Sequence, residues 1–178
     1  MRLLENIHNY DLVTFNWCLA RKYRQLMIQI SRIVSKTADG HLYGMLGVVL
    51  VLTGYYTLAA LMTATLIAER LMYLTLKNRL RRNRPPQAIP GFESIVTPSD
   101  QFSFPSGHTS AAFLFAGLIS AAWPTAALAL YPWAILVGCS RVMLGVHFPT
   151  DTIAGALLGY IFSVLGLYTL QVMQLSII

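Results

Sequence analysis

Charged residues are scarce in this chain. Asp, Glu, Lys and Arg make up 11% of the 178 residues, whereas hydrophobic residues make up 56%. A soluble globular domain has about 25% charged residues, so this chain has too few charged groups to cover a water-facing surface. The mean hydropathy of +0.57 agrees. The composition predicts a membrane protein, and the length suits a single domain over residues 1–178.

Cysteine is also scarce. The two cysteines, Cys18 and Cys139, match no paired metal-ligand spacing, and they predict no disulfide framework. We interpret both as packing residues. The first ten residues are mixed and polar, so we also expect no cleaved signal peptide.

The first predicted helix mixes apolar and basic residues. It runs from about Asp11 to Val34 and is interrupted by Arg21, Lys22 and Arg24. A central basic cluster is costly in hydrocarbon, so we interpret this helix as interfacial or only partly inserted.

More apolar segments follow. The stretch from His41 to Leu76 is too long for one span of about 20 residues, which predicts two helices joined near Gly54, the first one short. Residues 78–101 are polar and rich in proline, so they cannot continue a helix. We expect an extramembrane loop over about residues 78–106.

Three further helices are predicted in the second half of the chain. They run from Gly107 to about Trp123, from a turn at Pro124 to about Leu144, and from Pro149 to about Val172. The sequence therefore predicts an all-α, polytopic membrane bundle of about six helices, with its core at about residues 40–172.

Basic residues exceed acidic ones, and the net charge is +6. Five of the thirteen basic residues lie in one stretch after an apolar segment: Lys77, Arg79, Arg81, Arg82 and Arg84. This position favours anionic lipid headgroups as partners, and not nucleic acid. Two interpretations of Arg79, Arg81 and Arg82 stay open: they grip the second phosphate of a lipid diphosphate, or they form a solvated basic loop.

Ionisable residues almost disappear after Gln101. That half holds two formal charges, Arg141 and Asp151, and two histidines, His108 and His147. Ionisable groups in membrane segments are expensive and are functional candidates by default. The structural alternative is an Arg141–Asp151 ion pair that joins two helices. We assign structural roles to Glu69 and Arg70.

The predicted topology brings six ionisable groups to one membrane face. They stand where helices leave or enter that face: Lys77, Arg84, His108, Arg141, His147 and Asp151. Cations that stay charged suit a phosphate, since Arg offers bidentate contacts and Lys a point charge. Ser106 and Gly107 begin a helix, where backbone N–H groups and a hydroxyl favour an anion.

Two histidines beside such a site indicate covalent catalysis. Asp151 lies four residues after His147 and could orient its imidazole, so we interpret His147 as the nucleophile and His108 as the general acid. A metal site is the competing use of His108, His147 and Asp151. Three nearby cations oppose a divalent metal, so we expect no metal and no cofactor.

The same residues resemble the motifs of the type 2 phosphatidic acid phosphatase family, which shares its core with vanadium haloperoxidases. The first motif, Lys-(six residues)-Arg-Pro, matches Lys77 to Arg84-Pro85, and the second matches Pro105-Ser106-Gly107-His108. The third, Ser-Arg-(five)-His-(three)-Asp, matches Ser140-Arg141, His147 and Asp151. Each motif alone is suggestive, and the ordered triple is specific.

The resemblance implies a six-helix bundle that hydrolyses lipid phosphates or diphosphates through a phospho-histidine. It implies phosphate binding by Lys77, Arg84, Ser106, Gly107 and Arg141, with His108 as acid and His147 with Asp151 as nucleophile and orienter. The substrates expected of small bacterial members are undecaprenyl diphosphate, phosphatidylglycerophosphate or phosphatidic acid. The site is expected to open to the periplasm or exterior of the inner (plasma) membrane. A lipid phosphotransferase and a non-catalytic lipid-phosphate binding protein are the alternatives.

Overall fold

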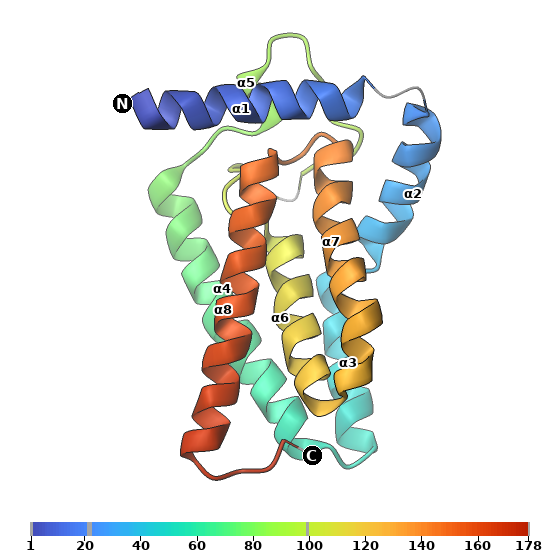
Figure 1. Cartoon of the computed structure of the whole chain (residues 1–178), viewed down its shortest axis with the longest axis vertical. Coiled ribbons are helices and arrows are strands. Elements are labelled where there is room, and N and C mark those ends of the chain that lie inside the picture. Colours follow the sequence, from blue (N-terminus) through green and yellow to red (C-terminus); the bar gives the residue numbers. More distant parts are fainter. Residues whose placement is uncertain (1, 21–22, 99, 178) are drawn as a thin grey trace.

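The computed structural model describes residues 2–20, 23–98 and 100–177, with side chains from Asn9 onward. Within these ranges the chain is helical and has no strand (Figure 1). The helices are α1 (Arg2–Leu19), α2 (Arg24–Lys36), α3 (Gly40–Leu52), α4 (Tyr56–Leu80), α5 (Pro85–Ala88), α6 (Gly107–Ala122), α7 (Ala127–Met143) and α8 (Pro149–Val172), with a 3₁₀ turn at Pro124–Ala126.

The long helices lie side by side, and α1 lies across one end of them (Figure 1). In the part of the chain that the structure describes, three segments are long and apolar enough to cross a membrane: Tyr56–Ala88, Pro124–Met143 and Pro149–Val172. α3 and α6 are shorter apolar helices. Large apolar side chains such as Leu128 and Leu157 are exposed on the outside, where lipid would cover them. The predicted all-α membrane bundle is confirmed.

The prediction of one continuous first helix was wrong. α1 ends at Leu19 and α2 begins at Arg24, while Arg21 and Lys22 lie outside the described residues. The sequence between the two helices contains no Pro or Gly, so no local signal marked the break. The position of α1 across the bundle end agrees with an interfacial helix.

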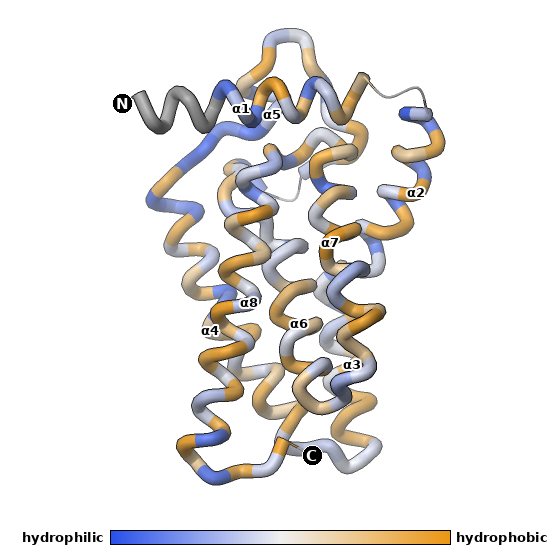
Figure 2. The backbone as a smooth tube through the Cα atoms, in the orientation of Figure 1, coloured by the Kyte–Doolittle hydropathy of each residue, from blue (hydrophilic) through white to orange (hydrophobic). Residues whose placement is uncertain are grey.

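The other boundaries follow their sequence signals. α3 and α4 meet at Gly54, whose φ of 87° suits glycine, and α8 begins at Pro149 as predicted. The predicted loop begins too early, because α4 continues to Leu80 and a short α5 follows. Figure 2 shows hydrophilic residues where α4 runs into this loop.

α8 packs against α6 through glycines one helical turn apart. A Cβ at Gly155 or Gly159 would collide with the backbone oxygens of Ser106 or Ser110. Small residues at this spacing let membrane helices approach closely. The close contact sets the start of α8 beside the start of α6, where the Ser106 N–H donates to the Asp151 carbonyl at 2.9 Å.

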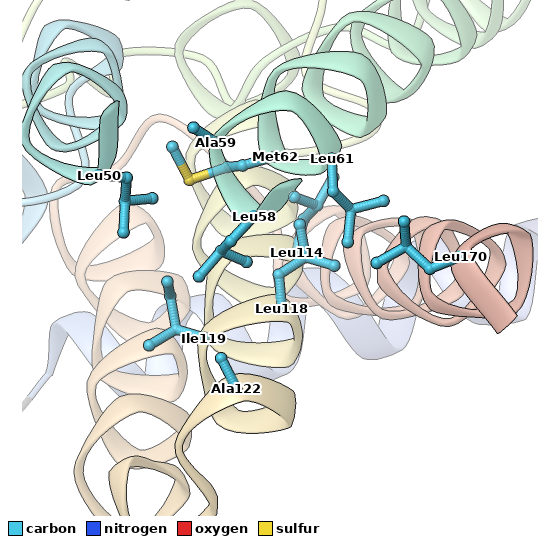
Figure 3. Close-up of a cluster of buried hydrophobic side chains, with 10 residues drawn as sticks. All are labelled: Leu50, Leu58, Ala59, Leu61, Met62, Leu114, Leu118, Ile119, Ala122 and Leu170. Carbon is cyan, nitrogen blue, oxygen red and sulfur yellow. The ribbon is translucent and has the colours of Figure 1, made fainter. Parts of the chain in front are cut away.

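An apolar cluster joins the end of α3 and the start of α4 to α6 and α8 (Figure 3). The junction of α3 and α4 lies at the end of the bundle away from α1 (Figure 1). Leu58 and Met62 of α4 meet Leu114 and Leu118 of α6, and all four are at most 1% exposed. Buried charged residues gather toward the other half, at the ends of α4 and α7 and the start of α8.

Candidate active site

Two cations from the first motif meet at one carboxylate. Lys77 lies in the last turn of α4, and Arg84 lies just before α5. Lys77 Nζ is 2.7 Å from Asp100 Oδ2, and Arg84 Nη2 pairs with Asp100 Oδ1. The Tyr73 hydroxyl donates to Asp100 Oδ2 at 2.7 Å. α4 ends at Leu80, so Arg84 reaches the site from the segment that follows this helix.

Asp100 stays ionised between these donors. Burial alone would raise the pKa of its carboxyl, but the hydrogen bonds from Lys77, Tyr73 and Arg84 outweigh burial and hold the pKa below its usual range. The carboxylate therefore receives the contacts that Lys and Arg make with an oxyanion.

His147 lies between α7 and α8 and is 2% exposed. Its Nε2 is 3.4 Å from Arg84 Nη1. Its Nδ1 is 3.7 Å from Asp151 Oδ2, which is longer than a hydrogen bond. The ring thus presents Nε2 to the cations and Nδ1 to the carboxylate.

The environment of His147 favours a neutral ring. Burial lowers the pKa of His147 to about 4, with Asp151 opposing the shift and Arg84 and Arg141 adding to it. A neutral imidazole has a free lone pair, which a nucleophile needs. With the proton on Nδ1 toward Asp151, that lone pair is on Nε2.

Asp151 lies in the first turn of α8 and is fully buried. Its Oδ2 accepts the Phe148 N–H at 2.8 Å, and its Oδ1 accepts from Arg82 Nη1 at 2.7 Å. Asp151 therefore pairs with Arg82, whereas the structural alternative from the sequence paired it with Arg141.

Arg141 lies in the last turn of α7, where its Nη1 donates to Ser35 Oγ of α2 at 2.7 Å. Its Nε is buried and has no hydrogen-bond partner among the described residues. An unsatisfied guanidinium N–H beside a cavity is a donor available to an anion.

His108 lies in the first turn of α6 and has a partner that the sequence did not indicate. Its Nε2 is 3.1 Å from Oδ1 of Asp39, the N-cap residue of α3. A carboxylate in this position orients the imidazole. Asp39 was not among the predicted site residues, because nothing in the sequence links it to a residue 69 positions later.

One cavity of about 1150 Å³ connects these groups. Its polar end is lined by Arg84, Asp100, Gly107, His108, Arg141 and His147. Lys77 reaches the same end through its contacts with Asp100 and Tyr73. Ser106 lies outside the lining, with its Oγ bonded to Thr109 Oγ1 at 2.9 Å.

From the polar end, the cavity extends between α3 and α4 as an apolar groove. Its walls include Gly44 and Val48 of α3 and Ala60 and Thr63 of α4. A Cβ added at Gly44 would meet no atom within 4 Å, so the groove is open at this glycine. The arrangement joins a phosphate-sized cluster of cations to space for an apolar chain.

Comparison with known proteins gives the family. The model of the PAP2 superfamily matches residues 41–174, and the chain belongs to this superfamily. A lipid A 1-phosphatase of Rhizobium johnstonii is 33% identical over 105 residues, which cover 57% of this chain and 43% of that protein. A decaprenylphosphoryl-5-phosphoribose phosphatase of Mycobacterium tuberculosis is 37% identical over 87 residues, 47% of this chain and 45% of that protein. The chain spans about half the length of the curated relatives it matches.

Two solved structures share the fold. The crystal structure of Aquifex aeolicus LpxE has a TM-score of 0.75 and 27% identity, covering 88% of this chain and 94% of that one. A transmembrane PAP2-type phosphatidylglycerolphosphate phosphatase from Bacillus subtilis has a TM-score of 0.77 and 24% identity, covering 93% of this chain and 87% of that one. The predicted family is confirmed.

Proposed function

We propose that the protein is a metal-independent lipid phosphatase, which hydrolyses the phosphomonoester or diphosphate of a membrane lipid. The continuous cavity carries this proposal. A cationic pocket with two histidines opens into an apolar groove between α3 and α4, so a lipid could lie in the groove with its phosphate at the histidines. The similarity to lipid phosphatases supports the same class of substrate.

In the proposed reaction, His147 Nε2 attacks phosphorus while the bond to the leaving oxygen breaks, and His108 gives that oxygen a proton. Water then attacks phosphorus and loses a proton to His108, while the bond between phosphorus and His147 Nε2 breaks. Phosphate leaves, and His147 is regenerated. Arg84, Lys77 and Arg141 offset the charge on the phosphoryl oxygens. Asp100 has to leave Lys77 and Arg84 before phosphate can bind between them.

We propose three candidate substrates, which are undecaprenyl diphosphate, phosphatidylglycerophosphate and phosphatidic acid. We further propose that the protein resides in the inner (plasma) membrane, with its site open to the periplasm or exterior. The proposed orientation places α1, which lies across the site end of the bundle, at that surface.

The test is phosphate release by the purified protein from these three lipids in the presence of EDTA. We expect activity to persist with EDTA and to fall at least about a thousandfold in His147→Asn, because the nucleophile is removed. A phosphoenzyme that is labile in acid and stable in base should accumulate in the wild type during turnover.

His41→Asn is the matched control, because His41 is exposed and outside the cavity lining. Loss of activity in EDTA, or full activity of His147→Asn, would contradict the proposed mechanism.

A further inference from the structure

Arg82 is turned inward from the basic stretch. Its Nη2 is 2.5 Å from Asp11 Oδ2, and its Nη1 is 2.7 Å from Asp151 Oδ1. Its Cζ lies 4.6 Å from the centre of the Phe148 ring. One guanidinium therefore joins two buried carboxylates, and this position differs from both interpretations of Arg82 that the sequence left open.

Asp11 brings helix α1 into the same network. It is 2% exposed, although it belongs to a helix that lies across the end of the bundle. Its Oδ1 accepts the Thr150 N–H at 3.0 Å, and its Oδ2 accepts from the Thr150 hydroxyl. The carboxylate thus binds the first turn of α8, where a negative charge is favourable. Asp151 lies in that same turn.

We propose that Arg82 and Asp11 are positioning residues, which hold Asp151 against His147 and set how strongly Asp151 stabilises positive charge on that imidazole. The inference rests on the proposed function, because it assigns a purpose to the Asp151–His147 pair. It goes further by adding two residues that the three motifs do not specify: Arg82, between Lys77 and Arg84, and Asp11 on α1.

The geometry supports a tuning role as well as a mechanical one. Among the described residues, Arg84 and Asp151 lie nearest the His147 ring, and Arg141 adds a further positive charge to its surroundings. Arg82 neutralises part of the Asp151 charge, and Asp11 in turn draws part of the Arg82 charge away. Because Arg82 is shared with Asp11, it neutralises less of the Asp151 charge than it would if it paired with Asp151 alone.

Removing the charge of Arg82 and removing the charge of Asp11 should move the pKa of His147 in opposite directions. In Arg82→Gln, Asp151 keeps its full charge, so the imidazolium is stabilised and the pKa of His147 rises. In Asp11→Asn, Arg82 acts on Asp151 alone, so the pKa of His147 falls. Neutral His147 is the reactive form, so the acid limb of kcat/KM should move to higher pH in Arg82→Gln and to lower pH in Asp11→Asn. We expect shifts of about half a unit or more.

The experiment measures two quantities on the full-length protein: the pH dependence of kcat/KM and the NMR titration of His147. The chain has four histidines, so His147→Asn identifies the His147 signal by its absence. Arg79→Gln is the matched control, because Arg79 is an exposed arginine of the same basic stretch. Arg82→Lys keeps the positive charge but loses the forked guanidinium that reaches both carboxylates. We therefore expect the acid limb of kcat/KM in this variant to stay near that of the wild type, while kcat falls.

Shifts of opposite sign in Arg82→Gln and Asp11→Asn, with none in Arg79→Gln, would establish the positioning pair. Shifts of the same sign in these two variants would overturn the proposal. So would lower activity with an unchanged pKa of His147, because Arg82 and Asp11 would then have only a structural role. The NMR titration needs no turnover. An inactive wild type would therefore refute the proposed function, while the titration would still decide the link between Arg82, Asp11 and His147.

Discussion

Asp100 occupies the place that the proposed mechanism gives to the substrate phosphate. Its two carboxylate oxygens receive Lys77, Arg84 and Tyr73, which resembles the way these donors would bind two phosphoryl oxygens. The side chain is 31% exposed, so it can exchange its protein contacts for water more readily than the buried cations can. In the proposed mechanism, this carboxylate and the substrate phosphate compete for the same cations.

Asp100→Asn should therefore bind phosphate analogues more tightly. An amide lacks the negative charge that Lys77 and Arg84 attract, so an incoming oxyanion displaces a weaker competitor. Charge-assisted hydrogen bonds are worth about 1.5–3 kcal/mol, which corresponds to roughly tenfold or more in affinity. The measurement is inhibition by vanadate, with KM for a lipid phosphate as a second readout.

Glu93→Gln serves as the control for this substitution, because it removes an exposed carboxylate from the same loop. Weaker vanadate inhibition in Asp100→Asn than in Glu93→Gln would mean that Asp100 supports anion binding and does not compete with it.

At the level of helices, we propose that the groove between α3 and α4 holds the lipid chain of the substrate. The glycines Gly40 and Gly44 lie one turn apart on α3, and a Cβ on either would meet no neighbour within 4 Å. A large side chain added there would stand in the groove. A large side chain at either position should therefore impair hydrolysis of long-chain substrates, and it should leave the phosphate pocket unchanged.

Gly44→Phe should lower kcat/KM for a long-chain lipid phosphate by about tenfold or more, since the ring takes space that the chain would fill. Hydrolysis of a short, water-soluble phosphate ester should change little. Met45→Phe is the control, because Met45 is 63% exposed on the same helix and outside the cavity lining. Equal losses on both substrates would show that the groove does not hold the chain.

The sequence predicted elements where a local signal exists. Gly54 and Pro149 stand at helix boundaries, and the helices around them matched the prediction closely. The break between α1 and α2 has no such residue, so it was missed. Spacing along the chain singled out Lys77, Arg84, His108, Arg141 and His147 as predicted site residues, and the structure brings them to one end of the cavity.

Asp39, Asp100 and the Asp11–Arg82 pair were not found, because their roles depend on contacts between distant parts of the chain. Asp100 lies 23 residues from Lys77, and Asp11 lies 71 residues from Arg82. Helix packing decides such pairings, and a single sequence carries no pattern for them.

At the scale of the whole molecule, the charges near the site do not report the membrane orientation directly. Counting basic residues would place the stretch after α4 on the cytoplasmic side. Yet Lys77, Arg82 and Arg84 each pair with carboxylates in the structure. Charges that neutralise one another inside the bundle do not act as free positive charges, so the count overstates the signal.

The proposed outward orientation can be tested by labelling from one side. In a variant with both native cysteines replaced by serine, Glu93→Cys places a thiol in the loop at the site end, and Thr53→Cys places one between α3 and α4 at the opposite end. A membrane-impermeant maleimide should label Glu93→Cys in intact cells, and Thr53→Cys only after permeabilisation. Both side chains are exposed, so a difference between them reports sidedness and not burial. The reverse labelling pattern would place the site in the cytoplasm, and lipid phosphates of the inner leaflet would then be the substrates within its reach.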